Sequence, residues 1–245
     1  MNRKIDFFIK GLKGRLTYLP PPLYNLISYR ILSKKLKPIH HTFHKIIYTS
    51  LNESSSPKII QIGSADGISG DPIYGYVKKF SRLGGAVLVE PVKENFQRLI
   101  KNYDRTPNLF FENVAIAEKD ERREFYRIKS KNIPDERRGS LRAEINLKRL
   151  RNGELIKEEV QCISFQTLIE KYNLNSVDLL HIDTEGYDFK IIKSINFSIL
   201  KPKIIFYEHK HLTDKERVEC QNLLISQGYE IFIKENDTLA VSRIS

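Results

Sequence analysis

From Lys58 to the end of the chain, short apolar runs alternate with amphipathic stretches, a pattern typical of strands alternating with helices. Strands are predicted at Lys58–Ile62, Ala86–Val89, Leu109–Asn113, Glu124–Ile128, Glu159–Ile163, Val177–Ile182 and Lys203–Tyr207, followed by a hairpin of Tyr229–Ile233 and Thr238–Val241. Helices are predicted at Lys93–Tyr103, Phe165–Lys171, Tyr187–Ser194 and Lys215–Gln227. Because most of these strands are almost continuously apolar, we expect an α/β fold with a mainly parallel sheet, helices on both faces and a C-terminal antiparallel strand.

Two segments fall outside this alternation. Residues 1–56 are predicted to form a basic, mainly helical N-terminal extension, interrupted at Pro20–Pro22 and again near Pro38. Residues 57–245 are predicted to form one domain. Within it, the charged segment Lys129–Glu158 does not follow the regular pattern and is a candidate lid or substrate-binding insertion.

The formal net charge of +11 is concentrated in the first fifth of the 245-residue chain. Residues 1–50 hold ten lysines and arginines and one acidic residue, Asp6, so they carry +9, while the rest of the chain carries +2. This distribution argues against a nucleic-acid partner for the body of the protein. It favours peripheral contact of residues 1–50 with an anionic membrane or a lipid-linked or phosphorylated glycan. A solvated structural cap or a homodimer arm is the alternative.

The cysteine content and the apolar runs indicate a compartment. Two cysteines, Cys162 and Cys220, are too few for a disulfide framework or a four-thiolate zinc site. The chain start lacks the apolar core of a signal peptide, and no window approaches the roughly 18 uncharged apolar residues of a membrane span. We therefore expect a cytoplasmic protein, with peripheral membrane contact as the variant that the basic extension suggests.

A run of small residues follows the first predicted strand, in the order Gly63-Ser64-Ala65-Asp66-Gly67. Such residues let a backbone turn sharply and approach a ligand, and in an α/β sheet this turn lies where ligands bind. The glycine spacing is not G-x-G-x-x-G, which disfavours a pyrophosphate cofactor, and the absence of Gly-Lys-Ser/Thr excludes a P-loop. Glu90, at the tip of the second strand, is placed to accept both hydroxyls of a ribose. The alternatives to a ligand-binding role are that residues 63–67 form an ordinary turn between a strand and a helix and that Glu90 is a solvated glutamate at a strand end.

Two further strand tips carry acidic and imidazole side chains, and in a parallel sheet both open onto the same crevice as the glycine turn. The first tip holds His181, Asp183 and Glu185, and the second holds Glu208, His209 and His211. The alternative to a catalytic role for the first tip is a structural one. In that case Asp183 or Thr184 caps the following helix, and His181 is a buried core residue.

Taken in order, these motifs resemble the FkbM family of S-adenosylmethionine-dependent methyltransferases. The resemblance covers about residues 58–210 and rests on Ile62-Gly63-Ser64-Ala65-Asp66-Gly67, Glu90-Pro91, Asn113-Val114-Ala115-Ile116, Ser164-Phe165-Gln166-Thr167-Leu168, His181-Ile182-Asp183-Thr184-Glu185-Gly186 and Tyr207-Glu208. It implies a Rossmann-like class I methyltransferase fold. The chain departs from the family at Gln61, where Asp or Glu is usual, and at His181, where Lys is most often found.

The resemblance also implies roles for individual residues. Binding of S-adenosylmethionine falls to Gly63, Ser64, Ala65, Asp66 and Gly67 around the methionine part, to Glu90 at the ribose, and to Pro91, Asn113 and Val114 beside the adenine. The catalytic candidates are Asp183, Glu208, His209, His181 and Glu185.

The leading functional hypothesis is O-methylation of a hydroxyl on a sugar, a glycan or a secondary metabolite. Methyl transfer to oxygen needs an acceptor whose proton is removed, and two routes are open. Either His209 or His211 acts as a general base, or Asp183 and Glu208 bind Mg²⁺, which lowers the pKa of the acceptor hydroxyl. A nucleic-acid methyltransferase is one alternative, although the chain lacks an Asn/Asp-Pro-Pro-aromatic motif after the Val177–Ile182 strand. A non-catalytic binding module of the same fold is the other.

Overall fold

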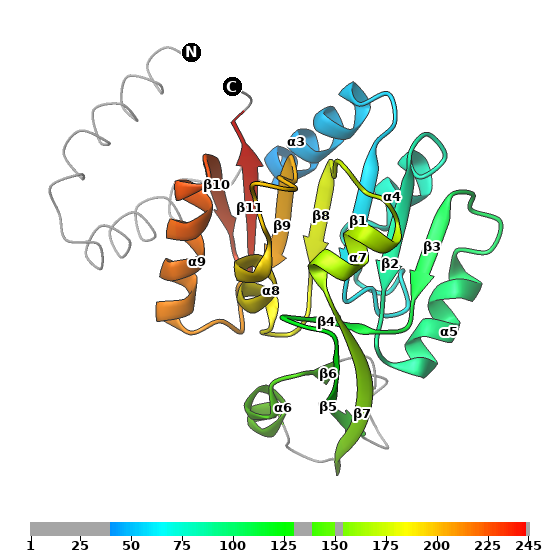
Figure 1. The fold of residues 1–245 in the computed structure, drawn as a ribbon, viewed down its shortest axis with the longest axis vertical. Coiled ribbons are helices and arrows are strands. Elements are labelled where there is room, and N and C mark those ends of the chain that lie inside the picture. Colours follow the sequence, from blue (N-terminus) through cyan, green and yellow to red (C-terminus); the bar gives the residue numbers. More distant parts are fainter. Residues whose placement is uncertain (1–39, 130–138, 150–153, 244–245) are drawn as a thin grey trace, which may run out of the picture. The chain divides into compact units, whose positions relative to one another are not determined.

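The computed structural model describes residues 40–129, 139–149 and 154–243, and its centre is a seven-stranded sheet (Figure 1). The strands lie in the order β10-β11-β9-β8-β1-β2-β3. Five of them are parallel neighbours, namely β1 (Lys58–Ile62), β2 (Gly85–Val89), β3 (Leu109–Glu112), β8 (Leu179–Ile182) and β9 (Ile204–Glu208). Strand β11 (Asp237–Ser242) runs antiparallel to β9 and forms a hairpin with β10 (Tyr229–Lys234). The predicted mainly parallel sheet with a C-terminal antiparallel strand is confirmed.

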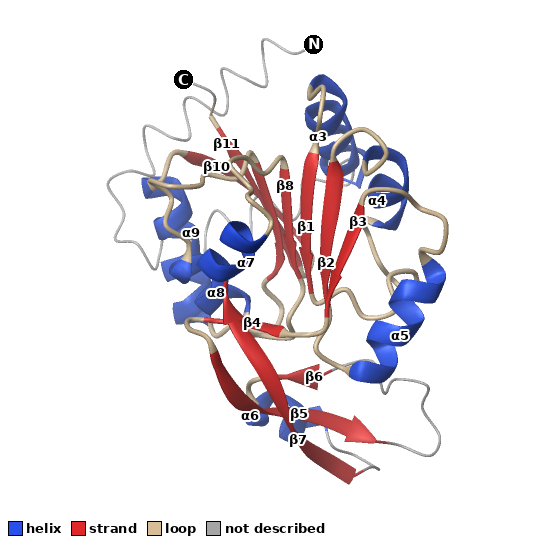
Figure 2. Ribbon diagram, turned by 45° about the vertical axis from the view of Figure 1, so that its right-hand side comes forward, coloured by secondary structure: helices blue, strands red, loops and turns tan. Residues whose placement is uncertain are grey.

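Helices cover both faces of this sheet, as predicted (Figure 2). One face packs against α7 (Phe165–Lys171), α8 (Asp188–Ser194) and α9 (Asp214–Ser226), through a core in which Ile182 and Tyr207 meet helix residues such as Leu168 and Ile192. On the other face, Phe43 of α3 (His40–Glu53) makes an edge contact with Phe206 of β9. Helices α4 (Tyr74–Phe80) and α5 (Lys93–Asn102) follow β1 and β2.

The end of the predicted N-terminal extension packs onto the domain. The larger compact unit of the chain spans Phe43–Ser245, so most of α3 belongs to it. Phe43, Ile47 and Leu51 are buried, which explains why this part of the extension is helical and amphipathic. The rest of the extension, with its predicted break near Pro38, lies outside the described residues. Among the residues that are described, no helix is both long and apolar enough to cross a bilayer.

A second sheet of four strands lies beyond the carboxyl ends of the first (Figure 1). Its order is β4-β7-β5-β6, from β4 (Ala115–Ala117), β5 (Glu121–Lys129), β6 (Gly139–Ser140) and β7 (Glu154–Ser164). Strands β5 and β7 form a long antiparallel pair, which contains the two predicted strands Glu124–Ile128 and Glu159–Ile163. The candidate insertion therefore includes β6, α6 (Ala143–Arg149) and the start of β7. Its residues 130–138 and 150–153 lie outside the described ranges, and its role as a lid stays a prediction.

Candidate active site

A pocket of about 220 Å³ lies at the carboxyl ends of the parallel strands, where the topology of an open α/β sheet places ligand sites. The main sheet contributes the turn after β1, the end of β2 and the tips of β8 and β9. The second sheet contributes Ala115, Ile116, Phe125 and Gly139, and Leu141 follows its strand β6. The pocket thus lies between the Rossmann-like core and the second sheet, and two of its lining residues, Gly139 and Leu141, belong to the predicted insertion.

The glycine turn after β1 approaches the tip of β8 more closely than any side chain would allow. Gly63 has a φ of +82°, and a Cβ at this position would lie 1.9 Å from the carbonyl oxygen of Asp183. The amides of Gly63 and Ser64 both donate to the Val89 carbonyl, each at 3.0 Å. Gly63 therefore lets three strand ends converge, and it lines the pocket itself.

Glu90 joins the end of β2 to the glycine turn. Its carboxylate accepts hydrogen bonds from the Ala65 amide at 2.8 Å and from the Val92 amide at 2.9 Å, and it is also bonded to Asn95. The side chain is 4% exposed, and this burial raises the pKa of Glu90 to about 7, against the hydrogen bonds, which favour the charged form. Glu90 and Ala65 both line the pocket, so the carboxylate stands at its wall.

The predicted cofactor-binding residues divide into two groups. Gly63, Ala65, Glu90, Pro91 and Val114 line the pocket, whereas Ser64, Asp66, Gly67 and Asn113 do not. The second group holds the loops in place. Asp66 accepts from the amides of Ile68 and Ser69 at 3.1 and 2.8 Å, and Asn113 donates to the carbonyls of Glu90 and Pro91 at 2.8 and 3.0 Å.

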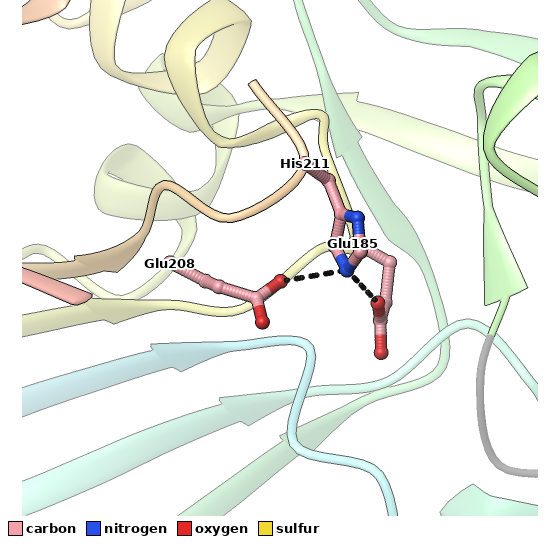
Figure 3. Close-up of side chains that lie close together, drawn as sticks. All are labelled: Glu185, Glu208 and His211. Carbon is pink, nitrogen blue, oxygen red and sulfur yellow. Dashed lines mark ion pairs between the residues drawn. The ribbon is translucent and has the colours of Figure 1, made fainter. Parts of the chain in front are cut away.

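An acidic cluster with one imidazole forms the part of the pocket at the tips of β8 and β9. Asp183, Glu185 and Glu208 line it. The Nε2 atom of His211 lies 3.3 Å from a carboxylate oxygen of Glu185 and 3.6 Å from one of Glu208 (Figure 3). These three side chains offer metal-ligand atoms within 4.8 Å of one another.

The carboxyl groups of this cluster hold their protons more tightly than usual. Burial raises the pKa of Asp183 well above its ordinary value, and the neighbouring carboxylates of Glu208 and Glu185 add to the effect. Burial, together with Glu185 and Asp188, raises the pKa of Glu208 to about 8, while Lys210 opposes the shift. Such perturbed groups in a pocket are typical of functional sites.

The loop that carries Glu185 is held from two directions. Glu185 has a φ of +54°, and its carbonyl accepts from the Ser140 hydroxyl at 3.0 Å. The Arg142 guanidinium donates to the Gly186 carbonyl at 3.1 Å and pairs with Glu216 at 2.8 Å. The predicted insertion therefore positions Glu185, an acidic residue of the pocket, and the hydrogen bonds of Arg142 contribute to this positioning.

The capping role considered for Asp183 or Thr184 is not observed. The N-cap residue of α8 is Tyr187, which makes no side-chain cap bond. Instead the buried Asp188 reaches back and accepts from the Thr184 hydroxyl at 3.0 Å and from the Gly186 amide at 3.1 Å. Asp183 is therefore not required for capping and faces the pocket.

Two of the candidate histidines are buried away from this pocket. His209 is 3% exposed, and its Nε2 donates to the Glu235 carbonyl at 3.1 Å, so Nδ1 accepts from Thr238 at 2.9 Å. Burial lowers the pKa of His209 to about 4, and its ring lines neither this pocket nor the neighbouring cavity. His181, also 3% exposed, packs against Phe206 at 4.8 Å and lines that neighbouring cavity. This placement does not favour the base role predicted for His209.

The fold and the pocket define a class I methyltransferase, with its site at the carboxyl ends of the strands. A sequence model of the methyltransferase FkbM domain matches residues 61–231, which is most of the chain. The protein belongs to the FkbM methyltransferase family, and S-adenosylmethionine is its methyl donor. No curated protein matches the chain.

Several solved structures are similar to this chain at low identity. An S-adenosylmethionine-dependent O-methyltransferase from Thermotoga maritima has 12% identity and a TM-score of 0.45, covering 86% of this chain and 67% of its own. A precorrin-6y C5,15-methyltransferase from Geobacter metallireducens has 10% identity and a TM-score of 0.43, with 81% and 87% covered. The fibrillarin pre-rRNA processing protein of Methanococcus jannaschii has 10% identity and a TM-score of 0.43, with 77% and 67% covered. Similarity at this level leaves the acceptor open.

Proposed function

We propose that this protein transfers the methyl group of S-adenosylmethionine to a hydroxyl oxygen of a sugar, a glycan or a secondary metabolite. The observation that carries the proposal is His211, an imidazole whose Nε2 lies 3.3 Å from Glu185 and 3.6 Å from Glu208, two carboxyl groups that line the donor pocket. Transfer to a hydroxyl requires a group that takes the hydroxyl proton, and an imidazole performs this at neutral pH.

The lining of the pocket fits the donor. Gly63 and Ala65 present backbone instead of bulky side chains, Glu90 offers carboxylate oxygens for ribose hydroxyls, and Pro91 and Val114 offer apolar surface for a base. When bound, the cofactor supplies a methyl group on a positively charged sulfur. The carboxyl groups of Asp183 and Glu208 line the pocket, and a bound sulfonium would favour their negatively charged form.

Within this site the acidic residues act on His211. The imidazole takes the acceptor proton on the ring nitrogen that carries no hydrogen and becomes positively charged, and Glu185 and Glu208 stabilise that charge because they lie beside Nε2. Ser140 and Arg142 keep the loop of Glu185 in place. In this scheme His211 is the base, and Glu185 and Glu208 orient it.

Metal assistance is the competing route. The predicted Mg²⁺ pair was Asp183 and Glu208, but the ligand-type atoms that converge belong to Glu185, Glu208 and His211. A set with an imidazole suits Mn²⁺ or Zn²⁺ better than Mg²⁺, which prefers oxygen ligands. We expect treatment with EDTA followed by gel filtration to leave the methylation rate unchanged. Loss of activity that returns on adding Mn²⁺ would favour the metal route instead.

Binding of the donor can be tested with Glu90. The Glu90→Gln variant should bind S-adenosylmethionine roughly tenfold or more weakly, because a charged hydrogen-bond acceptor is lost. Isothermal titration calorimetry measures the affinity, and Glu94→Gln is the matched control, since Glu94 lies outside the pocket with its side chain 53% exposed. If the wild-type protein gives no heat with S-adenosylmethionine, the proposed function fails.

The basic segment 1–50 is a candidate for recognition of the acceptor. We propose that it contacts an acidic acceptor or an anionic membrane surface, which its charge of +9 supports. Residues 1–39 lie outside the described ranges, so this proposal rests on composition.

A further inference from the structure

A second cavity of about 220 Å³ adjoins the donor pocket. Its polar lining consists of His181, Asp183, Glu208, Asn236 and Asp237. Asp183 and Glu208 line both cavities, so they form the boundary between them. A molecule in the second cavity would therefore lie next to the place where the methyl group is transferred. At about 30 Å³ per water molecule in the liquid, the volume accommodates several polar atoms of a ligand.

The lining of this cavity is rich in carboxyl groups. Three of them face it, from Asp183, Glu208 and Asp237, and among the described residues no lysine or arginine lines it. Lys210 and Lys234 act on Asp237 electrostatically, but neither belongs to the lining of this cavity. Phosphate, sulfate and carboxylate groups on a ligand therefore find no cationic partner among the described lining residues, whereas a positively charged group favours the ionised form of these carboxyl groups and is bound by them.

His181 provides an independent sign that the cavity receives a ligand. The residue is 3% exposed, yet its Nδ1 atom has no hydrogen-bond partner among the described residues. Burial lowers the pKa of His181 to about 3, so the ring is neutral and adds no positive charge. Buried polar groups are nearly always satisfied, so this nitrogen points to a polar group that the protein itself does not supply.

We propose that the second cavity binds the acceptor and selects one that carries a protonated amine close to the hydroxyl that is methylated. The proposal rests on the function proposed above and narrows its acceptor to amino sugars and similar amino alcohols. The ammonium group donates hydrogen bonds to Asp237 and Glu208, and the neighbouring hydroxyl lies at the boundary formed by Asp183 and Glu208. An uncharged sugar makes the hydrogen bonds but lacks the charge, so it binds more weakly.

The test compares three sugars that differ at one position. Calorimetry is performed with the full-length protein saturated with S-adenosylhomocysteine, the demethylated donor, and with EDTA in every solution so that metal ions contribute nothing. We expect D-glucosamine to bind about tenfold more tightly than D-glucose, which corresponds to about 1.4 kcal/mol. N-acetyl-D-glucosamine, which keeps the substituent but loses the charge, should bind no better than D-glucose. Equal affinity for the three sugars, or no binding of any of them, overturns the proposal.

A variant locates the effect in the second cavity. Asp237→Asn should remove most of the preference for D-glucosamine while the affinity for S-adenosylhomocysteine stays unchanged, because Asp237 does not line the donor pocket. Asp214→Asn is the control, since the Asp214 side chain is 99% exposed on α9. A preference that persists in Asp237→Asn contradicts the assignment. If S-adenosylhomocysteine itself does not bind to the wild-type protein, the proposed function fails; if it binds and the sugars show no preference, only this inference fails.

Discussion

The His211→Gln variant should lower kcat roughly 10²- to 10⁴-fold, the range that a general base contributes. His211 contacts Glu185 and Glu208, which line the donor pocket, and is not itself part of that lining, so its loss removes the proton acceptor without changing the wall that binds the donor. The affinity for S-adenosylmethionine, measured by calorimetry, should stay unchanged. Single-turnover kinetics, in which formation of the O-methylated product is followed over time, measures the rate of the chemical step itself.

His209→Gln is the matched control for this experiment. The two histidines are two positions apart, but His209 is bonded to Thr238 and to the Glu235 carbonyl and lines no part of the donor pocket. We expect this variant to lose stability, because a buried hydrogen-bonded ring is replaced, and to keep kcat per folded molecule. A large drop of kcat in His209→Gln with none in His211→Gln would reverse the assignment of the base.

The acidic cluster has a cost in stability that follows from its raised pKa values. The pKa of Glu208 is about 8 in the folded protein and near its ordinary 4.5 when the chain is unfolded. Its favourable contribution is therefore fully present below about pH 4.5 and is lost as the pH rises through about 8. Glu90 and Asp188, whose pKa values are about 7, act in the same direction. The fold thus retains carboxyl groups that weaken it at neutral pH, which is expected where they serve a function.

The sequence was sufficient to predict the bounds of some elements that pack in the core. The observed β1 (Lys58–Ile62) and α7 (Phe165–Lys171) have the predicted bounds. The apolar run of β1 is a strong signal for a buried strand. The start of α7 is marked by Ser164, which caps the helix by accepting from the Thr167 amide. The glycine turn and Glu90 were also predicted in place, since their positions follow from the ends of such strands. Five of the nine predicted cofactor residues line the pocket.

Local patterns could not reveal the second sheet or the contact of His211 with two glutamates. Strand β4 has three residues and pairs with the end of β7, which lies far along the chain, so no periodicity marks it. The convergence of Glu185 with His211 depends on the positive φ of Glu185, which is unusual for a non-glycine residue, and on Ser140, which lies 45 positions away in the sequence. The spacing of Glu208 and His211, three positions apart after a strand, was the one local sign, and it did not distinguish His211 from His209.

Gly63→Ala should be strongly destabilising, because the added methyl group meets both a backbone clash and a left-handed conformation. Its Cβ would lie 1.9 Å from the Asp183 carbonyl oxygen and 2.8 Å from the carbonyl carbon, and both atoms are backbone and cannot move aside cheaply. Overpacking costs about 1–3 kcal/mol, and a left-handed conformation costs an L-residue about 1–2 kcal/mol more. Together these terms take up a large part of the roughly 5–15 kcal/mol that stabilises a domain. Urea unfolding followed by circular dichroism measures the loss.

Gly70→Ala separates the clash from the conformational strain. Gly70 also has a positive φ, +75°, but a Cβ there would meet nothing within 4 Å, so this variant should lose only about 1 kcal/mol. Equal losses in the two variants would mean that the turn after β1 moves freely away from β8. The geometry argues otherwise, because the amide of Asp183 also donates to the Ile62 carbonyl at 2.9 Å. The turn that holds the donor and the strand tip that carries Asp183 are therefore one unit, and a methyl group at Gly63 displaces both.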